Sequence, residues 1–302
     1  MSPRIFMSGP AIELSGLQKR FGERVALRAV DLRVEEGELV GFVGPNGAGK
    51  TTCMRILVGL MFADDGSASV LGMDPARQSL EIRKRCCYLP GETSIYQQMT
   101  GAEFLAFALS FYKQQSDIAR ELHEIFPLPL KQKVRSYSSG MKQKLAILAS
   151  LIPDVSLHVL DEPDRALDAN SRLDLRGILK TLQRRGKSIL LSSHQLSEVE
   201  ALADRTVFLV AGRSVDEEHV RAARDSLRKA VRIRLDGDLE LPSGTAKVTH
   251  QSDGSIHITT TGNPLDWLAQ LPSEKVLTAE VGATRLEDLY SLLTHYVETG
   301  EN

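Results

Sequence analysis

A run of eight residues has the pattern of a phosphate-binding loop: Gly44, Pro45, Asn46, Gly47, Ala48, Gly49, Lys50 and Thr51. An apolar stretch short enough for a buried strand, residues 39–43, precedes it, and a stretch with helical character, residues 52–58, follows it. Three glycines allow successive backbone N–H groups to converge on one point, toward which the following helix directs its positive end. The loop therefore predicts a site for the phosphates of a nucleoside triphosphate.

Three side chains in and beside this loop complete the predicted phosphate site. Lys50 carries a mobile positive charge that can reach the outer phosphates, and the Thr51 hydroxyl suits Mg²⁺ as a ligand. Thr52 can donate a hydrogen bond to the inner phosphate. An ordinary glycine-rich turn is the alternative, but such a turn does not require this pattern between a strand and a helix.

Two adjacent acids follow the apolar strand expected at residues 155–160. Asp161 can hold Mg²⁺ through its water shell, and Glu162 can polarise a water molecule for attack on the outer phosphate. A solvated acidic pair is the alternative, and the phosphate loop favours the functional interpretation. His194 ends another apolar strand, residues 188–193, and is expected to donate a hydrogen bond to the outer phosphate.

Two further features belong to this hypothesis. The turn at a helix start that comprises Ser138, Ser139, Gly140 and Met141 is a second candidate anion site, although such turns are also common helix caps. The chain has no second phosphate loop for it to serve, so a second copy of the chain is expected to supply the nucleotide. Phe21, expected in a loop between strands, can stack on a nucleobase, with simple packing as the alternative.

Composition limits the class of protein. The 302 residues carry a net charge of −2, which gives no reason to expect nucleic acid as a partner. Three cysteines without ligand-like spacing, Cys53, Cys86 and Cys87, suggest neither a disulfide framework nor a zinc site. No apolar run of about 18 residues is present, so we expect a soluble cytoplasmic chain.

The pattern along the chain predicts an α/β fold followed by a smaller domain. Short alternating strands are expected before the loop, and residues 102–153 have helical periodicity, with Phe104, Phe107 and Phe111 on one face. The expected divisions are a flexible tail at 1–10, an ATPase domain at 11–227 with a helical insertion at about 95–153, and a small α+β domain at 228–302.

Together these stretches resemble the nucleotide-binding subunit of an ATP-binding cassette (ABC) transporter over residues 11–215. The resemblance implies a P-loop NTPase cassette, in which a mixed sheet carries an antiparallel subdomain and a helical insertion. It assigns Phe21 to adenine stacking, residues 44–51 to the Walker A motif and Ser138 to Met141 to the signature turn. It also assigns Asp161 and Glu162 to the Walker B motif and catalytic glutamate, residues 166–168 to the D-loop, and His194 to the switch histidine.

The sequence departs from that family pattern at a few positions. The usual glutamine after Tyr-Leu-Pro is replaced by Gly91 and Glu92, and Glu92 is a candidate substitute near Mg²⁺. Asp164, Ala166 and Ala169 stand where threonine, glycine and proline are usual in and around the D-loop.

The resemblance further implies partners and a mechanism. ATP and Mg²⁺ are the expected cofactors, two copies are expected to close head to tail on ATP, and a separate membrane permease, of the export type, is expected to hold the subunit at the cytoplasmic face of the membrane. The alternatives are an ABC ATPase of DNA repair or translation and a regulatory module that binds ATP without turnover. The first class usually carries two cassettes, zinc-binding insertions or long coiled coils, and the sequence shows none of these. The presence of Lys50, Asp161, Glu162 and His194 argues against the second.

Overall fold

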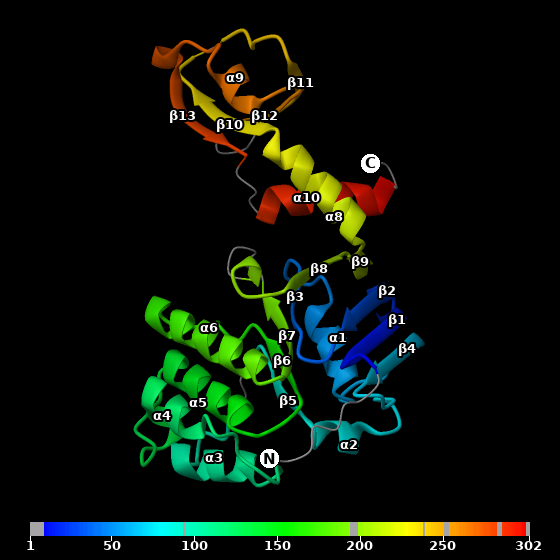
Figure 1. Ribbon diagram of the computed structural model, residues 1–302, viewed down its shortest axis with the longest axis vertical. Helices are drawn as coiled ribbons and strands as arrows, with labels where there is room; N and C mark the ends of the chain where they lie inside the picture. The colour runs from blue at the N-terminus through cyan, green and yellow to red at the C-terminus, as the bar shows by residue number, and fades with distance from the viewer. Residues whose placement is uncertain are drawn as a thin grey trace. The chain divides into compact units, whose positions relative to one another are not determined.

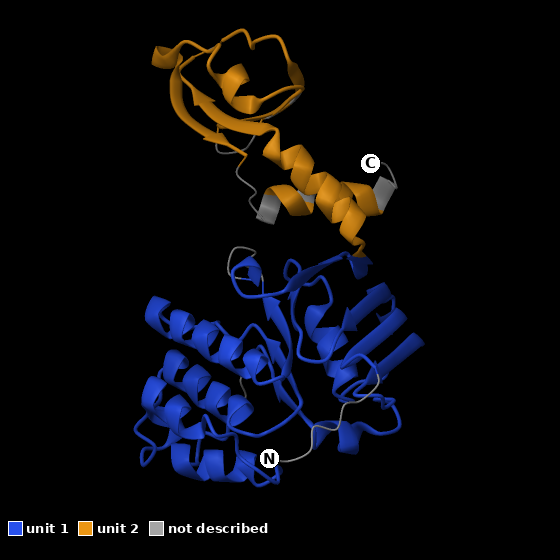
Figure 2. Ribbon diagram, viewed as in Figure 1, with its two compact units in different colours: residues 1–214 blue, residues 215–302 orange. Residues whose placement is uncertain are grey.

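The computed structural model describes residues 9–92, 95–193, 199–237, 239–250, 254–282 and 286–299. Their contacts divide the chain into two compact units, residues 1–214 and 215–302 (Figure 2). The division lies before helix α8 (Glu217–Arg228), whereas the expected domain boundary, residue 227, lies near its end. Helix α8 packs on α10 (Leu286–Thr299), which explains why its contacts place it in the second unit.

A mixed nine-stranded sheet forms the centre of the first unit in the described residues (Figure 1). Its strands lie in the order β4-β1-β2-β9-β8-β3-β7-β6-β5. The parallel part consists of β3 (Leu39–Val43), β5 (Cys86–Leu89), β6 (Leu157–Asp161), β7 (Ser188–Ser193) and β8 (Arg205–Val210). The short strand β9 (Arg213–Val215) lies between this parallel part and the antiparallel strands, and it pairs in parallel with the nearest of the latter, β2.

The strands β3, β6 and β7 are buried along their whole length because helices cover both faces of the sheet. Alternate residues, such as Phe42 and Val159, pack with helix α1 (Lys50–Leu57) in one core. The residues between them, such as Leu160, pack in a second core with α5 (Ser139–Leu151) and α6 (Ala169–Arg184). The carboxyl ends of β3, β6 and β7 are therefore held at one edge, where α/β sheets place their sites.

The antiparallel strands before the loop are longer than expected. They are β1 (Ile12–Phe21) and β2 (Arg24–Val34), with β4 (Asp65–Val70) pairing to the far side of β1. Bulges along β1 interrupt the regular alternation that marks a strand in a sequence, so only pieces of each strand were predicted. The expectation that Phe21 lies in a loop is wrong, because it is the last residue of β1 and pairs with Arg24.

The helical insertion comprises α3 (Gly101–Leu109), α4 (Ala119–Ile125) and α5, after the short helix α2 (Ser79–Arg83) and strand β5. A capping box, in which Thr100 and Glu103 satisfy each other's backbone N–H groups, begins α3. The aromatic residues expected on one helix face do not all lie in one helix, although the rings of Phe107 and Phe111 contact each other. Phe111 lies beyond the end of α3 and is 64% exposed, and Phe107 is also exposed.

The second unit contains a four-stranded antiparallel sheet in the described residues, in the order β11-β12-β10-β13. Its strands are β10 (Ala230–Leu235), β11 (Thr245–His250), β12 (Ile256–Thr260) and β13 (Val276–Val281). Helix α9 (Pro264–Leu268) places Trp267 in a core with Val231, Ile233 and Ile258. Strand β13 was not predicted, because its exposed residues show no apolar alternation.

Candidate functional site

The phosphate-binding loop joins β3 to α1 at the carboxyl edge of the sheet. Gly49 is the residue before α1 and has a φ of 110°, which an L side chain rarely adopts. A Cβ there would lie 2.6 Å from Leu27 Cδ2 and 2.7 Å from the Ala26 carbonyl oxygen. Glycine is therefore required at this position both by backbone conformation and by the close approach of β2.

Lys50 lies within the loop that it serves. Its side chain is 6% exposed, and its Nζ donates to the carbonyl oxygens of Gly44, at 2.5 Å, and Pro45, at 3.2 Å. Burial lowers the pKa of the Lys50 ammonium, and the charges of Glu162 and Asp161 oppose that shift. The charge is thus held beside both predicted acids, within reach of phosphate at the loop.

Asp161 is the last residue of β6 and is buried. Its Oδ2 accepts a hydrogen bond from the Thr51 hydroxyl at 2.6 Å. The pair joins the first turn of α1 to the end of β6, two segments 110 residues apart. A hydroxyl and a carboxylate suit Mg²⁺, which proteins often bind through one or two oxygen ligands together with substrate phosphates. No group of three or more His, Cys, Asp or Glu side chains poised for a metal occurs in the described residues.

Glu162 follows Asp161 and has a φ of 47°, in the left-handed region. Its backbone N–H donates to Ser192 Oγ at 3.0 Å, and the Ser192 hydroxyl donates to Asp161 Oδ1 at 2.6 Å. Sequence reasoning missed Ser192. The signal was available, because a serine near the end of the neighbouring parallel strand must lie beside the acids.

A pocket brings the loop, the acid and the predicted base-stacking residue together. Phe21, at the end of β1, is 47% exposed there, and Arg24 faces it from β2 across a tight hairpin. The pocket is lined by Phe21, Arg24, Ala26, Asn46, Gly47, Gly49, Lys50, Thr51, Thr52 and Glu162. The structure therefore gathers the predicted nucleotide-binding residues of β1, the loop and β6 around one opening.

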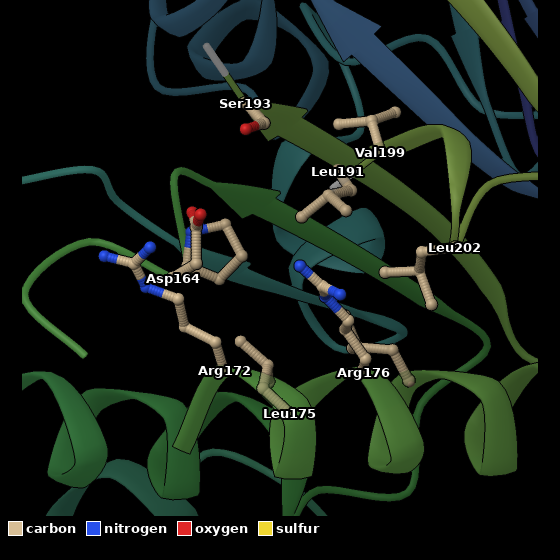
Figure 3. A pocket seen from close by; sticks show the side chains of 10 residues that line it. Asp164, Arg172, Leu175, Arg176, Leu191, Ser193, Val199 and Leu202 are labelled. Atoms are coloured by element: carbon tan, nitrogen blue, oxygen red, sulfur yellow. The ribbon is translucent and has the colours of Figure 1, made fainter. Parts of the chain in front are cut away.

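A second pocket lies between α6 and the strands β6 and β7 (Figure 3). Leu175 of α6, Leu191 of β7 and Leu202 line it from different sides with apolar side chains, and Arg172 and Arg176 extend into it from α6. The phosphate-binding loop does not line it. The predicted phosphate site is therefore part of the first pocket and not of the second.

The turn before α5 has the geometry of a helix cap. Ser138 precedes the helix, and its Oγ accepts a hydrogen bond from the Met141 N–H at 3.2 Å. A Cβ on Gly140 would lie 3.1 Å from the Ala166 carbonyl oxygen, so the D-loop passes directly over this turn. Gln143 is buried in α5 and donates to the Pro163 carbonyl oxygen at 2.8 Å, which ties the helix to the segment after the acids.

The remaining predicted residues are placed less directly at the site. Glu92 is exposed, and Gly91 lies against Asp161, since a Cβ on Gly91 would be 3.3 Å from Asp161 Oδ2. Arg165 donates to the Gly91 carbonyl oxygen at 3.2 Å. His194 lies outside the described residues.

Two other features of the described residues bear on the expectations from composition. The three cysteines are buried and unpaired, and burial raises the pKa of the Cys53 and Cys87 thiols to about 12. Such thiols are unreactive at neutral pH. Among the described helices, none is both long and apolar enough to span a bilayer.

Comparison with known proteins shows similarity to one family. A family model described as ABC transporter matches residues 27–165. The daunorubicin resistance ATP-binding protein DrrA2 of Streptomyces coeruleorubidus is 32% identical, with 98% of each chain covered. The Nod factor export ATP-binding protein I of Rhizobium sp. (strain N33) is 35% identical over 70% of this chain and 71% of that protein.

Solved structures are similar to the first unit. A structure of an ATP-binding subunit of an ABC transporter is 29% identical, with a TM-score of 0.64 over 70% of this chain and 92% of that one. The dimeric structure of MJ0796, a bacterial ABC transporter cassette, shares the fold at 23% identity, with a TM-score of 0.60 over 68% of this chain and 97% of that one. With the loop, the acids and the helical insertion in their places, the chain belongs to the family of ABC transporter ATP-binding proteins.

Proposed function

We propose that this chain binds Mg²⁺ and ATP in the pocket beside the phosphate-binding loop, hydrolyses the ATP and thereby powers a separate membrane permease. The observation that carries the proposal is the 2.6 Å hydrogen bond between Thr51 and Asp161. It brings the Mg²⁺ ligand expected in the loop to the acid expected at the strand end, with Lys50 and Glu162 beside them.

The residues of the pocket have separate roles in the proposed reaction. The backbone N–H groups of the loop and the Lys50 ammonium bind and orient the phosphates, while Phe21 offers a ring face to the base. Thr51 and Asp161 would hold Mg²⁺, which when bound neutralises charge on the phosphate oxygens. Glu162 orients the attacking water and accepts its proton, and the proposal keeps His194 as a donor to the outer phosphate.

The proposal includes a second copy of the chain. The turn of Ser138 and Gly140 offers the positive end of α5, where an anion is favoured. Relatives of this fold include a dimeric cassette. In a head-to-tail pair, the turn of each copy faces the nucleotide held by the other, so ATP binding closes the dimer and hydrolysis reopens it.

The permease is assigned to the exposed aromatic residues of the helical insertion. Tyr96, Phe107 and Phe111 are exposed and form two edge-to-face ring contacts, with centroids 5.6 and 5.2 Å apart. Exposed apolar side chains that contact one another mark interaction surfaces. Gly91, five residues before Tyr96 in the sequence, accepts a hydrogen bond from Arg165, which follows the acids.

The relatives indicate the direction of transport. The name of one relative includes Nod factor export, and the name of another includes daunorubicin resistance, which an exporter of that compound would provide. We infer that this chain serves an exporter and works at the cytoplasmic face of the membrane through its permease. A role in DNA repair or translation is not favoured, because the matching family model is described as ABC transporter and one relative is a Nod factor export protein.

Two substitutions test the site. Lys50→Ala should abolish ATP binding, because backbone donors alone cannot replace a buried ammonium beside the phosphates. Glu162→Gln should retain binding of Mg²⁺ and ATP and slow hydrolysis by about 10²-fold or more, the loss expected for a general base. Lys84→Ala, on the exposed face of α2, is the control for both. Normal ATP affinity in Lys50→Ala would overturn the nucleotide site.

Sizing chromatography of the Glu162→Gln protein at high concentration tests the shared site. With Mg²⁺ and ATP this variant should form dimers, because unhydrolysed ATP keeps two copies together. Adding Ser138→Arg should abolish the dimer and leave ATP binding intact, since the bulky cation fills the turn. Ser110→Arg, at the exposed end of α3, is the control and should leave the dimer intact. A dimer that persists after Ser138→Arg is added would contradict the shared site.

A further inference from the structure

Ser192 connects the two acids of the site to strand β7. Its side chain is fully buried. The Ser192 hydroxyl donates to Asp161 Oδ1 at 2.6 Å and accepts the Glu162 backbone N–H at 3.0 Å. A single hydroxyl therefore contacts the side chain of the first acid and the main chain of the second.

The strand register places the hydroxyl of Ser192, and not that of Ser193, beside Asp161. Asp161 and Ser192 are paired residues in the parallel strands β6 and β7. Successive side chains of a strand point to opposite faces, so Ser193 lines the other pocket, on the side of α6 (Figure 3). The adjacent serine is thus no substitute for Ser192.

The two hydroxyl groups that donate hydrogen bonds to Asp161 contact different oxygens of its carboxylate. Thr51 donates to Oδ2, and Ser192 donates to Oδ1. Because Thr51 is the other residue expected to hold Mg²⁺, Oδ2 is the oxygen on the side of the metal. Ser192 therefore fixes the rotation of the carboxylate from the opposite side. Hydrogen bonds of this kind orient metal ligands and affect metal affinity strongly.

Ser192 also acts on the backbone of Glu162. A residue other than glycine adopts a φ of 47° only where its surroundings hold it there. The hydrogen bond from the Glu162 N–H to Ser192 is such a restraint, at the point where the chain leaves β6. It fixes the direction in which the glutamate enters the pocket.

We propose that Ser192 is a positioning residue of the ATP site, whose hydroxyl orients Asp161 toward Mg²⁺ and holds the backbone of Glu162 in its hydrolytic conformation. The inference rests on the proposed ATPase function. It assigns to β7 a part in the site that the phosphate-binding loop and the acids do not supply themselves.

Ser192→Ala tests the proposal, with Ser188→Ala as a matched control. Ser188 is also a buried serine of β7, and its hydroxyl also accepts a backbone N–H, that of Gly37 at 2.9 Å, but it lies at the opposite end of the strand. Ser192→Ala should raise the Mg²⁺ concentration at half-saturation of binding of a fluorescent ATP analogue by about 10-fold and lower kcat by about 10-fold or more. Ser188→Ala should change neither.

A general loss of stability would not produce this result, because it would affect both variants in thermal unfolding and neither in the Mg²⁺ midpoint. An unchanged midpoint in Ser192→Ala, or an equal shift in Ser188→Ala, would overturn the proposal. Should Ser192→Ala fail to fold, Ser192→Cys and Ser192→Thr replace it. Ser192→Cys, whose thiol is a weak donor, should shift the Mg²⁺ midpoint, whereas Ser192→Thr, which retains a hydroxyl, should not.

The wild-type protein separates this proposal from the function on which it rests. Wild-type protein that binds no ATP, or binds it without hydrolysis, would overturn the proposed ATPase. Wild-type protein that hydrolyses ATP, together with a Ser192→Ala variant that has the wild-type Mg²⁺ midpoint and kcat, would overturn the role of Ser192 alone.

Discussion

The two units differ in what their buried polar groups do. In the first unit, the charged residues Lys50 and Asp161 are buried at the edge of the sheet; Lys50 donates within its own loop to Gly44, and Asp161 accepts from Thr51, 110 residues earlier. In the second unit, the buried polar residues of the described chain, Ser255 and Thr260, are uncharged. Trp267 donates to Thr245 at 3.0 Å, and Thr260 donates to the Lys229 carbonyl oxygen at 2.9 Å.

Backbone conformation shows the same difference. The residues other than glycine with positive φ in the described part of the chain are Leu71, Glu162, Ala166 and Ala211, all in the first unit. Two of them, Glu162 and Ala166, are the second acid and the first residue of the D-loop. Strained backbone and buried charge occur together where a site must be assembled, whereas a supporting domain follows the rules of packing. We therefore expect the ATP site to depend on the first unit alone.

The largest expected effect tests that independence. Ile258 is fully buried at the centre of the second unit, and Ile258→Ala should destabilise this unit by about 2–5 kcal/mol. ATP affinity should stay within about 3-fold of wild type, less than the 1.4 kcal/mol that a tenfold change represents. Trp267 is the single tryptophan of the chain, so its fluorescence in a urea titration follows the second unit, while a fluorescent ATP analogue follows the first.

Leu265→Ala is the control for this substitution, because the Leu265 side chain is exposed on α9 and its removal leaves no cavity. Both variants should bind ATP equally well in the absence of urea. Loss of ATP binding in Ile258→Ala at the urea concentration where its tryptophan signal unfolds, while Leu265→Ala still binds ATP there, would show that the second unit contributes to the site.

A smaller effect should appear in the pH dependence of the first unit. His158 is fully buried in β6, and burial lowers its pKa to about 4, the accepting Ser150 carbonyl oxygen opposing the shift. The unfolded chain takes up a proton near pH 6.5 and the folded chain only near pH 4. The stability that His158 contributes is therefore complete above pH 6.5 and is lost as the pH falls to about 4.

The substitution His158→Leu removes this pH dependence. At pH 7 the variant should be less stable by about 1 kcal/mol, because the Ser150 carbonyl oxygen loses its donor. Between pH 6.5 and 4.5, scanning calorimetry should show the wild type losing more stability than the variant, so that the difference shrinks or reverses. His123→Leu, on the exposed side of α4, should follow the wild type. Parallel pH profiles for wild type and His158→Leu would contradict the assignment.

The sequence was most informative where chemistry restricts residue types. The loop from Gly44 to Thr51, the acids Asp161 and Glu162, and the alternation of apolar strands with helices predicted the cassette fold, which the solved structures of relatives confirm. In each case a fixed spacing reflects a local requirement, such as the positive φ of Gly49 or the strand end before the acids.

The remaining features depend on contacts that spacing does not reveal. Ser192 joins the site through the register of two strands, and the position of Phe111 depends on where α3 ends. The bulges of β1 hid the length of that strand. Helix α8 could be predicted, but its packing on α10, which places it in the second unit, is a long-range contact.

The smallest expected effect concerns the strain that distinguishes the first unit. Ala166 has a φ of 61°, where the family pattern has glycine, and an L residue in the left-handed region costs about 1–2 kcal/mol. Ala166→Gly relieves that cost but adds freedom to the unfolded chain, so we expect a net gain in stability of at most about 1 kcal/mol. Scanning calorimetry of the full chain should show a rise in the melting temperature of the first unit.

Ala149→Gly provides the opposite control, since Ala149 lies within helix α5, where glycine costs about 0.5–1 kcal/mol. The carbonyl oxygen of Ala166 lies against Gly140, so the conformation of Ala166 determines how the D-loop meets the turn at the start of α5. A glycine at position 166 that stabilises the unit should therefore also loosen that contact, which amide hydrogen exchange at Gly140 and Met141 would detect. A fall in melting temperature would mean that the contacts around Ala166 require its side chain more than its backbone conformation costs.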